Sequence, residues 1–540
     1  MNIRANIPAA PADPGKRIVR QRDIIHRRAL AEKIEEIIAE HGMPEARAKI
    51  LPILQDALAN GRAEISKRLL KKPSAGHEMA AAQSFLVDQL VRLIHDIAVH
   101  HQYPIGNPSS GERIAVMAVG GYGRGEMAPH SDVDIAFLTP HKTTSWTEQA
   151  VEAMLYWLWD LGLKVGQSSR SIDEMVRMAK GDLSIRTALL EGRYIWGDTG
   201  VYEDAKQRFF NEVVAGTDST FVAEKLAERD ARHKKMGDSR YVVEPNVKEG
   251  KGGMRDLQTL YWIGKYIHRV ASAEDLVDVG LLTADEFKRF RKAANFLWAV
   301  RCHMHDMTGR AEDRLTFDLQ PEVARRMHFA DRPGKSSVER FMQYYFLNAK
   351  VVGNLTGVFL AHLDETHNAG VRRFLPSLTR KPKKLNGFVL DRGRLALPEE
   401  EFFASDPVRL VEIFWLADKH GLEIHPMAMR AARRDAKLID NKIRKDARAN
   451  KLFLDVLCSP RDPELVLRWM NEAAIFGRFI PDFGRVVAQM QFDMYHHYTV
   501  DEHTIRAIGL LARIGRGDLV EDHPNSTATM EKLQNRRVLF

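Results

Sequence analysis

The fold of this chain is decided by residues 114–138, IAVMAVGGYGRGEMAPHSDVDIAFL. An apolar run, Ile114 to Val119, predicts a β-strand that enters a glycine-rich loop at Gly120. A second apolar run leaves this loop and carries Asp132 and Asp134. Because alternate residues of a strand face the same way, the two carboxylates are expected to project together.

Two carboxylates at this spacing repel each other, and one is expected to protonate unless a cation compensates. Mg²⁺ suits carboxylate oxygens together with substrate phosphates. Glycines such as Gly120 and Gly121 let backbone N–H groups approach phosphate oxygens, and Arg124 offers a further phosphate contact. The stretch therefore predicts a nucleoside-triphosphate and Mg²⁺ site suited to in-line attack at phosphorus. The alternative interpretation is a tight hairpin with solvent-exposed acids.

Other glycine-loop sites do not fit the sequence. The chain has no GxxxxGK[ST] motif at this position, which excludes a P-loop. A GxGxxG pattern that starts at Gly121 would need glycine where Glu126 stands. One that starts at Gly123 ends at Ala128, but Pro129 and a strand follow where a dinucleotide site needs a helix.

Composition is that of a globular protein with several domains. A length of 540 residues predicts roughly two to four domains. No run approaches the roughly 18 apolar residues that span a bilayer, and the N-terminus lacks an apolar signal core, so no membrane association is expected. The two cysteines, Cys302 and Cys458, suit a reducing, cytoplasmic location. A net charge of +8 favours acidic partners such as nucleotides, and nucleic acid is not an expected partner.

Hydrophobic periodicity predicts an α+β protein in which a small mixed sheet is embedded in mostly helical regions. A third strand is expected at Leu163 to Ser169. The expected helices cover Arg22 to His101, Trp146 to Leu161, Ile172 to Lys180, Leu183 to Trp196, Asp285 to Thr308, Ser337 to His367 and a basic helix from Arg430 to Lys451.

The glycine loop and Asp132-Val133-Asp134 resemble the GG/GS…DxD signature of the DNA polymerase beta-type nucleotidyltransferase superfamily. Together with KEGKGGMRDLQTL and YTVDEHT further along, the stretch resembles one family of that superfamily. This family is the bacterial bifunctional uridylyltransferase/uridylyl-removing enzymes, which modify the PII nitrogen-signalling protein. The similarity extends from about residue 20 to the end of the chain.

The resemblance implies transfer of UMP from UTP to a tyrosine hydroxyl of PII, with release of pyrophosphate. It implies that Asp132 and Asp134 hold Mg²⁺, and that Gly120, Gly121 and Ser131 belong to the nucleotide site. The superfamily often has a third carboxylate on a later strand, but the third strand here carries no acid. The acids just beyond it, between which the sequence does not choose, are Asp173, Asp182 and Glu191. A general base is not assigned.

A glycine-rich loop from Lys248 to Asp256 carries three cations, Lys248, Lys251 and Arg255. A helix begins near Asp256, and its N-terminal N–H groups would also favour an anion. We expect a flexible loop that closes over the nucleotide or PII, and the three cations are assigned to the nucleotide site. The alternative is a basic surface turn.

His503, in YTVDEHT, matches the first metal ligand of the HD-type phosphohydrolase domain that removes UMP in this family. No adjacent His-Asp pair follows it up to Phe540, so His503 is expected to be an orphan ligand. The chain is therefore expected to be C-terminally truncated, without uridylyl-removing activity or the glutamine-sensing ACT domains. Three other pairs are interpreted as fortuitous, namely His95-Asp96, His305-Asp306 and His496-His497.

The family comparison divides the chain into seven expected regions. They are a flexible leader (1–20), an N-terminal helical region (21–110), the nucleotidyltransferase core (111–200), a helical domain associated with it (201–370), a basic linker (371–400), a second helical region (401–495) and the incomplete start of the HD domain (496–540). Two alternative functions stay open: a nucleotidyltransferase acting on RNA or a small molecule, and a non-catalytic nucleotide-binding sensor.

Overall fold

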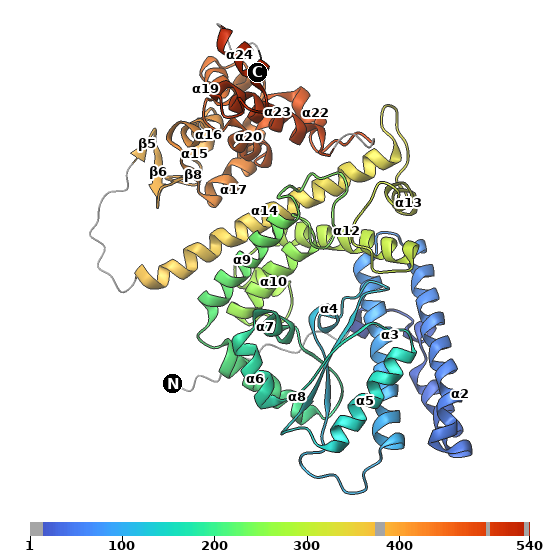
Figure 1. Cartoon of the computed structure of the whole chain (residues 1–540). Coiled ribbons are helices and arrows are strands. Elements are labelled where there is room, and N and C mark those ends of the chain that lie inside the picture. Colours follow the sequence, from blue (N-terminus) through green and yellow to red (C-terminus); the bar gives the residue numbers. More distant parts are fainter. Residues whose placement is uncertain (1–13, 373–383, 493–496, 534–538, 540) are drawn as a thin grey trace. The chain divides into compact units, whose positions relative to one another are not determined.

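The computed structural model describes residues 14–372, 384–492, 497–533 and 539. The chain divides into two compact units. Unit 1 consists of Met1–Asp238 and Asn246–Phe329, and unit 2 consists of Ser239–Pro245 and Ala330–Phe540. Figure 1 shows the helices and strands of both, and the expected α+β fold is confirmed.

Unit 1 contains a four-stranded sheet with the strand order β3-β2-β1-β4. The two central strands, β1 (Ala115–Ala118) and β2 (Val133–Thr139), are antiparallel and almost entirely buried, as expected for the apolar runs that flank the glycine loop. β3 (Val165–Ser171) pairs with β2 in parallel, and β4 (Arg193–Gly197) pairs with β1 in antiparallel.

Helices cover both faces of this sheet. Side chains of α6, α7 and α8 pack beside Met117 of β1, and α3 and α5 lie on the opposite side (Figure 1). The α-helices of unit 1 are α1 (Gln21–Ile24), α2 (Arg27–Lys71), α3 (Gly76–Asp96), α4 (Gly120–Gly123), α5 (Ser145–Asp160), α6 (Ile172–Gly181), α7 (Leu183–Leu190), α8 (Thr199–Arg208), α9 (Asp218–Lys235), α10 (Met254–His268), α11 (Asp275–Asp278), α12 (Ala284–Thr308) and α13 (Gln320–Arg326).

The expected helix from Leu183 to Trp196 is wrong in its second half, where the structure has strand β4. The helix ends at Leu190, and the chain then returns to pair with β1. Glycine suits this close turn, because a Cβ on Gly192 would lie 2.7 Å from the sulfur of Met117 and 3.0 Å from the carbonyl oxygen of Leu189. Pairing with a buried strand therefore overrides the helical periodicity of this segment.

Unit 2 also contains a sheet, which the sequence did not predict. Its strands are β5 (Lys384–Leu385), β6 (Phe388–Asp391), β7 (Arg394–Ala396) and β8 (Glu423–Ile424), in that order. Asn386-Gly387 and Arg392-Gly393 form the turns between the first three strands, with positive φ at all four residues, as two-residue hairpin turns require. The expected basic linker at 371–400 is thus folded from Lys384 onward, whereas residues 373–383 lie outside the described residues.

The helices of unit 2 begin with the long α14 (Ser337–Arg372). The others are α15 (Phe402–Ser405), α16 (Arg409–His420), α17 (Pro426–Asp435), α18 (Asn441–Arg444), α19 (Ala447–Leu457), α20 (Pro463–Glu472), α21 (Phe476–Phe479), α22 (Pro481–Val486), α23 (Val500–Arg516) and α24 (Pro524–Lys532). A single basic helix from Arg430 to Lys451 is wrong. Asp440 and Asp446 cap the N-termini of α18 and α19 with their side chains, and these caps start new helices within the basic run.

A buried ion pair joins α3 to β4 and to the glycine loop. Arg193 donates two hydrogen bonds to Asp88, at 2.8 and 3.0 Å, and both side chains are almost completely buried. The same guanidinium donates to the carbonyl oxygens of Tyr122 and Gly123. The position of the glycine loop therefore depends on this pair.

We expect Asp88→Asn to lower the free energy of unfolding of unit 1 by about 3 kcal/mol, because it leaves the buried charge of Arg193 uncompensated. Urea denaturation followed by circular dichroism measures the change. Asp56→Asn, at an exposed position of α2, is the matched control and should unfold like the wild type. Equal stability of all three proteins would contradict the importance of the pair.

Candidate active site

The glycine loop is a tight turn held between β1 and β4. Its first residues form the short helix α4, and Gly120 has a φ of +59°. Gly123 passes so close to the end of α7 that a Cβ there would lie 2.3 Å from the carbonyl oxygen of Glu191. The loop is thus fixed by contacts that only glycine allows.

Asp132 immediately precedes β2 and is exposed, whereas Asp134 is the second residue of β2 and is partly buried. The Asp134 carboxylate lies between the glycine loop and β3. A Cβ on Gly120 would lie 3.4 Å from one of its oxygens, and a Cβ on Gly166 would lie 2.4 Å from the other. The structure therefore brings Gly120 and Asp134 together, as the sequence predicts.

The charge of this pair is left without a close protein partner. Burial raises the pKa of Asp134, the neighbouring charge of Asp132 raises it further, and Lys248 lowers it. Among the described residues, neither carboxylate has a hydrogen bond or ion pair. Two oxygen-ligand groups whose charges repel each other fit a hard divalent cation such as Mg²⁺.

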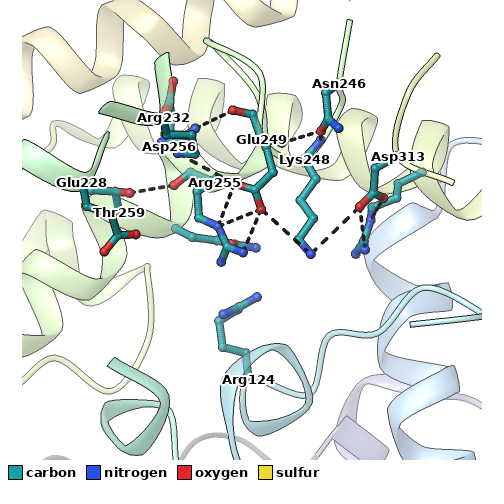
Figure 2. A network of polar contacts seen from close by, with 12 residues as sticks. Arg124, Glu228, Arg232, Asn246, Lys248, Glu249, Arg255, Asp256, Thr259 and Asp313 are labelled. Carbon is teal, nitrogen blue, oxygen red and sulfur yellow. Dashed lines mark hydrogen bonds and ion pairs between the residues drawn. The ribbon is translucent and has the colours of Figure 1, made fainter. Parts of the chain in front are cut away.

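Lys248 belongs to a network of alternating charge that Figure 2 shows from close by. We call Lys248, Arg255 and Arg301 the cation cluster. Glu249 accepts from Arg255 at 2.9 Å, and Asp313 accepts from Arg301 at 2.6 Å. Lys248 lies between these acids at 3.9 and 4.0 Å, so it is the least tightly held of the three cations.

Arg124 has a different environment from the phosphate contact that was expected. Its guanidinium donates to Glu126 at 2.9 Å and to the almost fully buried Glu191 at 2.5 Å. Burial alone would lower the pKa of Arg124, but the two carboxylates outweigh it and the pKa is raised. Arg124 thus braces the glycine loop against Glu191, although Figure 2 shows its side chain directed toward the cation cluster.

Two other predicted nucleotide contacts have intramolecular partners. The hydroxyl oxygen of Ser131 accepts from the N–H of Ala128 at 3.2 Å and closes the turn before Asp132. The Lys251 ammonium donates to the carboxylate of Asp238 at 2.7 Å. A role in nucleotide binding for these residues stays a prediction.

The three candidates for a third carboxylate are all engaged elsewhere. Asp173 accepts from Arg208, Asp182 caps the N-terminus of α7, and Glu191 accepts from Arg124 and from the indole of Trp262. The described part of the chain holds no group of three His, Cys, Asp or Glu side chains placed to bind a metal ion. None of the candidates therefore joins Asp132 and Asp134 in these residues.

The loop from Lys248 to Asp256 is closed by hydrogen bonds within unit 1, and its closing over a nucleotide or PII stays a prediction. The Asn246 side chain accepts from the N–H groups of Lys248 and Glu249, and the N–H of Arg255 returns to the carbonyl oxygen of Lys248. The chain thus folds back on itself in unit 1 and holds Lys248 and Arg255 in fixed positions.

Asp256 anchors the end of the same loop. Its carboxylate accepts from Arg232 at 2.6 Å, from His233 at 2.8 Å and from the N–H of Gly252 at 2.8 Å. Burial would raise the pKa of Asp256, but these partners outweigh it and lower the pKa to about 2. The start of α10 is therefore occupied by an internal anion.

His503 lies exposed on α23, while the acids that precede it are buried. Asp501 accepts from Asn471 at 2.9 Å and from Thr499 at 2.6 Å, so this part of the motif serves packing in unit 2. A metal-binding role for His503, and the absence of uridylyl removal, stay predictions.

The other histidine pairs have ordinary environments. His95 lies beside Asp96 in α3, at 3.2 Å. In α12, His305 contacts Asp313 at 3.2 Å, and Asp306 forms an ion pair with Arg326. His496 lies outside the described residues.

Family models of known proteins match three parts of this chain. A family model described as a nucleotidyltransferase domain matches residues 108–195, which contain the glycine loop and both aspartates. A model described as GlnD PII-uridylyltransferase matches residues 220–360, and one described as the third domain of uridylyltransferase GlnD matches residues 388–479.

Three similar proteins carry the name bifunctional uridylyltransferase/uridylyl-removing enzyme. They come from Novosphingobium aromaticivorans, Erythrobacter litoralis and Rhodospirillum rubrum, with identities of 66%, 60% and 50% over 97% of this chain. This chain is similar to these proteins over almost its whole length. It spans 57%, 57% and 56% of the length of these relatives. The matching family models and the names of these relatives support a nucleotidyltransferase enzyme. No helix among the described residues is long and apolar enough to cross a bilayer.

Gly166, Arg301 and Asp313 contribute to the site but were not predicted from the sequence. Gly166 did carry a signal, because a glycine inside a strand often marks a close approach. Arg301 and Asp313 carried none. They lie more than fifty residues from Lys248 along the chain, and only the packing of α12 brings them to it.

Asp256→Asn should lower the free energy of unfolding of unit 1 at pH 7 by about 3 kcal/mol, since Arg232 and His233 lose their anion. A carboxyl whose pKa is depressed stabilises the fold above its ordinary pKa, and this contribution disappears as the pH falls through about 2. The difference from wild type should therefore shrink between pH 5 and pH 2. Urea denaturation across this range measures it.

The exposed Asp204 provides the matched control, because Asp204→Asn removes a carboxylate of α8 that is not buried. A pH-independent difference between Asp256→Asn and wild type would contradict the assigned role of this carboxylate.

Proposed function

We propose that this chain transfers UMP from UTP to a tyrosine hydroxyl of a PII signalling protein, in a Mg²⁺-dependent reaction. The observation that carries this proposal is the uncompensated pair Asp132 and Asp134 beside the glycine loop, with Lys248 acting on Asp134. The names of the relatives and of the matching family models support UMP as the transferred group and PII as the acceptor.

Asp132 and Asp134 would hold the Mg²⁺. When bound, the ion neutralises phosphate charge and aligns the attacking and leaving oxygens. The N–H groups of the glycine loop would approach the phosphates, with Gly120 keeping the space beside Asp134 open. The cation cluster would balance the remaining negative charge of the triphosphate.

In the proposed reaction the tyrosine oxygen forms a bond to the α-phosphorus of UTP. The bond from this phosphorus to the oxygen that bridges to the β-phosphate breaks, and pyrophosphate leaves with that oxygen. The tyrosine hydroxyl gives up its proton to solvent. Among the described residues neither cysteine forms a disulfide, which suits the reducing cytoplasm in which we place the reaction.

The proposal is tested by incubating the chain with PII, Mg²⁺ and UTP labelled at the α-phosphate. Label should move to PII, and Asp132→Asn and Asp134→Asn should each reduce the rate by at least about a hundred-fold, because each removes a metal ligand. Asp204→Asn is the control for loss of one acid. Undiminished transfer by both site variants would overturn the assignment, and label on RNA or a small molecule instead of PII would change the acceptor.

A second test compares two lysines of one loop. Lys248 is loosely held and its charge lowers the pKa of Asp134, whereas Lys251 is paired with Asp238. Lys248→Gln should therefore raise the KM for UTP by about ten-fold or more, as expected for loss of a charged contact, and Lys251→Gln by less than about two-fold. Initial rates at varied UTP concentration measure both. An equal effect of the two substitutions would contradict the proposed role of the cation cluster.

A further inference from the structure

The sheet of unit 1 has two edge strands, β4 and β3. The main-chain groups of these two strands differ in their hydrogen bonding. Helix α3 contacts β4, and the Arg92 side chain of that helix donates to the carbonyl oxygen of Ile195 at 3.2 Å. Tyr194, in the same strand, donates its hydroxyl to the carbonyl oxygen of Gly197. Side chains thus donate hydrogen bonds to two carbonyl oxygens of this strand.

The β3 edge offers its main chain to a partner. The N–H of Val133 donates to the carbonyl oxygen of Lys164, and β2 and β3 continue in register from there. Because main-chain groups alternate in direction along a strand, those of Val165, Gln167 and Ser169 point away from β2. In the described part of the chain, no hydrogen bond reaches these three outward N–H groups.

The same edge is accessible and lies beside the catalytic carboxylate. Gly166 and Gln167 are exposed. Gly166 pairs with Asp134, and its missing side chain is what makes room for the Asp134 carboxylate. The strand VGQSSRS contains no proline and no acid, and its one cation is Arg170. It thus has few of the features by which proteins block an edge.

We propose that the β3 edge binds the protein acceptor by strand addition: an extended, tyrosine-bearing segment of the acceptor pairs with Val165, Gln167 and Ser169. This inference rests on the proposed function. A strand added there lies about 10 Å from β2, which is two strand spacings. A tyrosine on the Asp134 face of that strand points back across Gly166 toward the metal site.

Main-chain pairing explains how an acceptor is oriented without a dedicated pocket. In strand addition the hydrogen bonds of the backbone supply affinity, and alternate side chains are directed to one face. Only every second residue of the acceptor segment faces Asp134, so the register of pairing selects which residue is modified. A second copy of this chain is the competing occupant of such an edge.

The test is Gln167→Pro, which removes one outward N–H and places a ring on the edge while leaving the bonds to β2 in place. We expect kcat/KM for PII to fall about ten-fold or more relative to Gln167→Ala, which changes the side chain and keeps the N–H. The affinity for UTP with Mg²⁺, measured by equilibrium dialysis with a non-hydrolysable UTP analogue, should change less than about two-fold. Equal kcat/KM values for the two variants would overturn the inference.

Hydrogen exchange on the wild-type chain gives a second measurement that needs no variant. Addition of PII should slow exchange of the Gln167 and Ser169 amides, and unchanged exchange under saturating PII would overturn the inference. A wild-type dimer that Gln167→Pro dissociates would also overturn it, since the edge would then bind a second copy. If the wild type transfers no label to PII, the proposed function fails; if it does and the two Gln167 variants behave alike, only the docking inference fails.

Discussion

The repulsion between Asp132 and Asp134 is the constraint around which unit 1 is built. The strand pairing of β2 places the two carboxylates beside each other, and burial of Asp134 makes its charge still less favourable. A protein that needed only stability would neutralise such a pair with an arginine. Here Arg124, which is near in sequence, is turned to Glu126 and Glu191 instead. The negative charge of the two carboxylates is thus left to be balanced by a cation from outside the chain.

Three glycines make this arrangement sterically possible. Gly123 lets the loop lie against Glu191, while Gly120 and Gly166 leave space on the two sides of the Asp134 carboxylate. A side chain at Gly166 would displace the carboxylate or separate β3 from β2. The glycine that admits the Asp134 carboxylate therefore also lies in the exposed edge strand of the sheet.

Sequence periodicity was sufficient to predict the core of unit 1 but not its boundaries. The runs that form β1 and β2 are apolar and short, and the loop between them has strong turn residues, so local signals and tertiary pairing agree. Strand β4 failed as a prediction because its pairing with β1 comes from a distant part of the chain. The sheet of unit 2 was not predicted, because most of its strands lie in a segment that was interpreted as a basic linker. Asn386-Gly387 in that segment is nevertheless a strong hairpin signal.

In the site, too, contacts between residues close in sequence could be predicted, and contacts between distant residues could not. Asp134 and Gly120 could be brought together from the sequence, because Gly120 follows β1, Asp134 lies in β2, and these two strands are joined by a short loop. The roles of the basic residues could not be predicted, because the sequence does not show which acidic group each basic side chain contacts. Glycine-rich loops carry all three of Arg124, Lys248 and Lys251. Only the structure shows that Arg124 and Lys251 are bound closely by acids and that Lys248 is not.

Lys248 differs from the other two in the length of its contacts. Arg255 and Arg301 hold Glu249 and Asp313 at hydrogen-bond distance, which leaves these acids already paired when Lys248 approaches them. At 3.9 and 4.0 Å Lys248 gains little from either acid, and burial lowers its pKa, so its ammonium is in an unfavourable position without a further anion. The excess positive charge near Lys248 and the excess negative charge at Asp132 and Asp134 are complementary to a triphosphate and its metal ion.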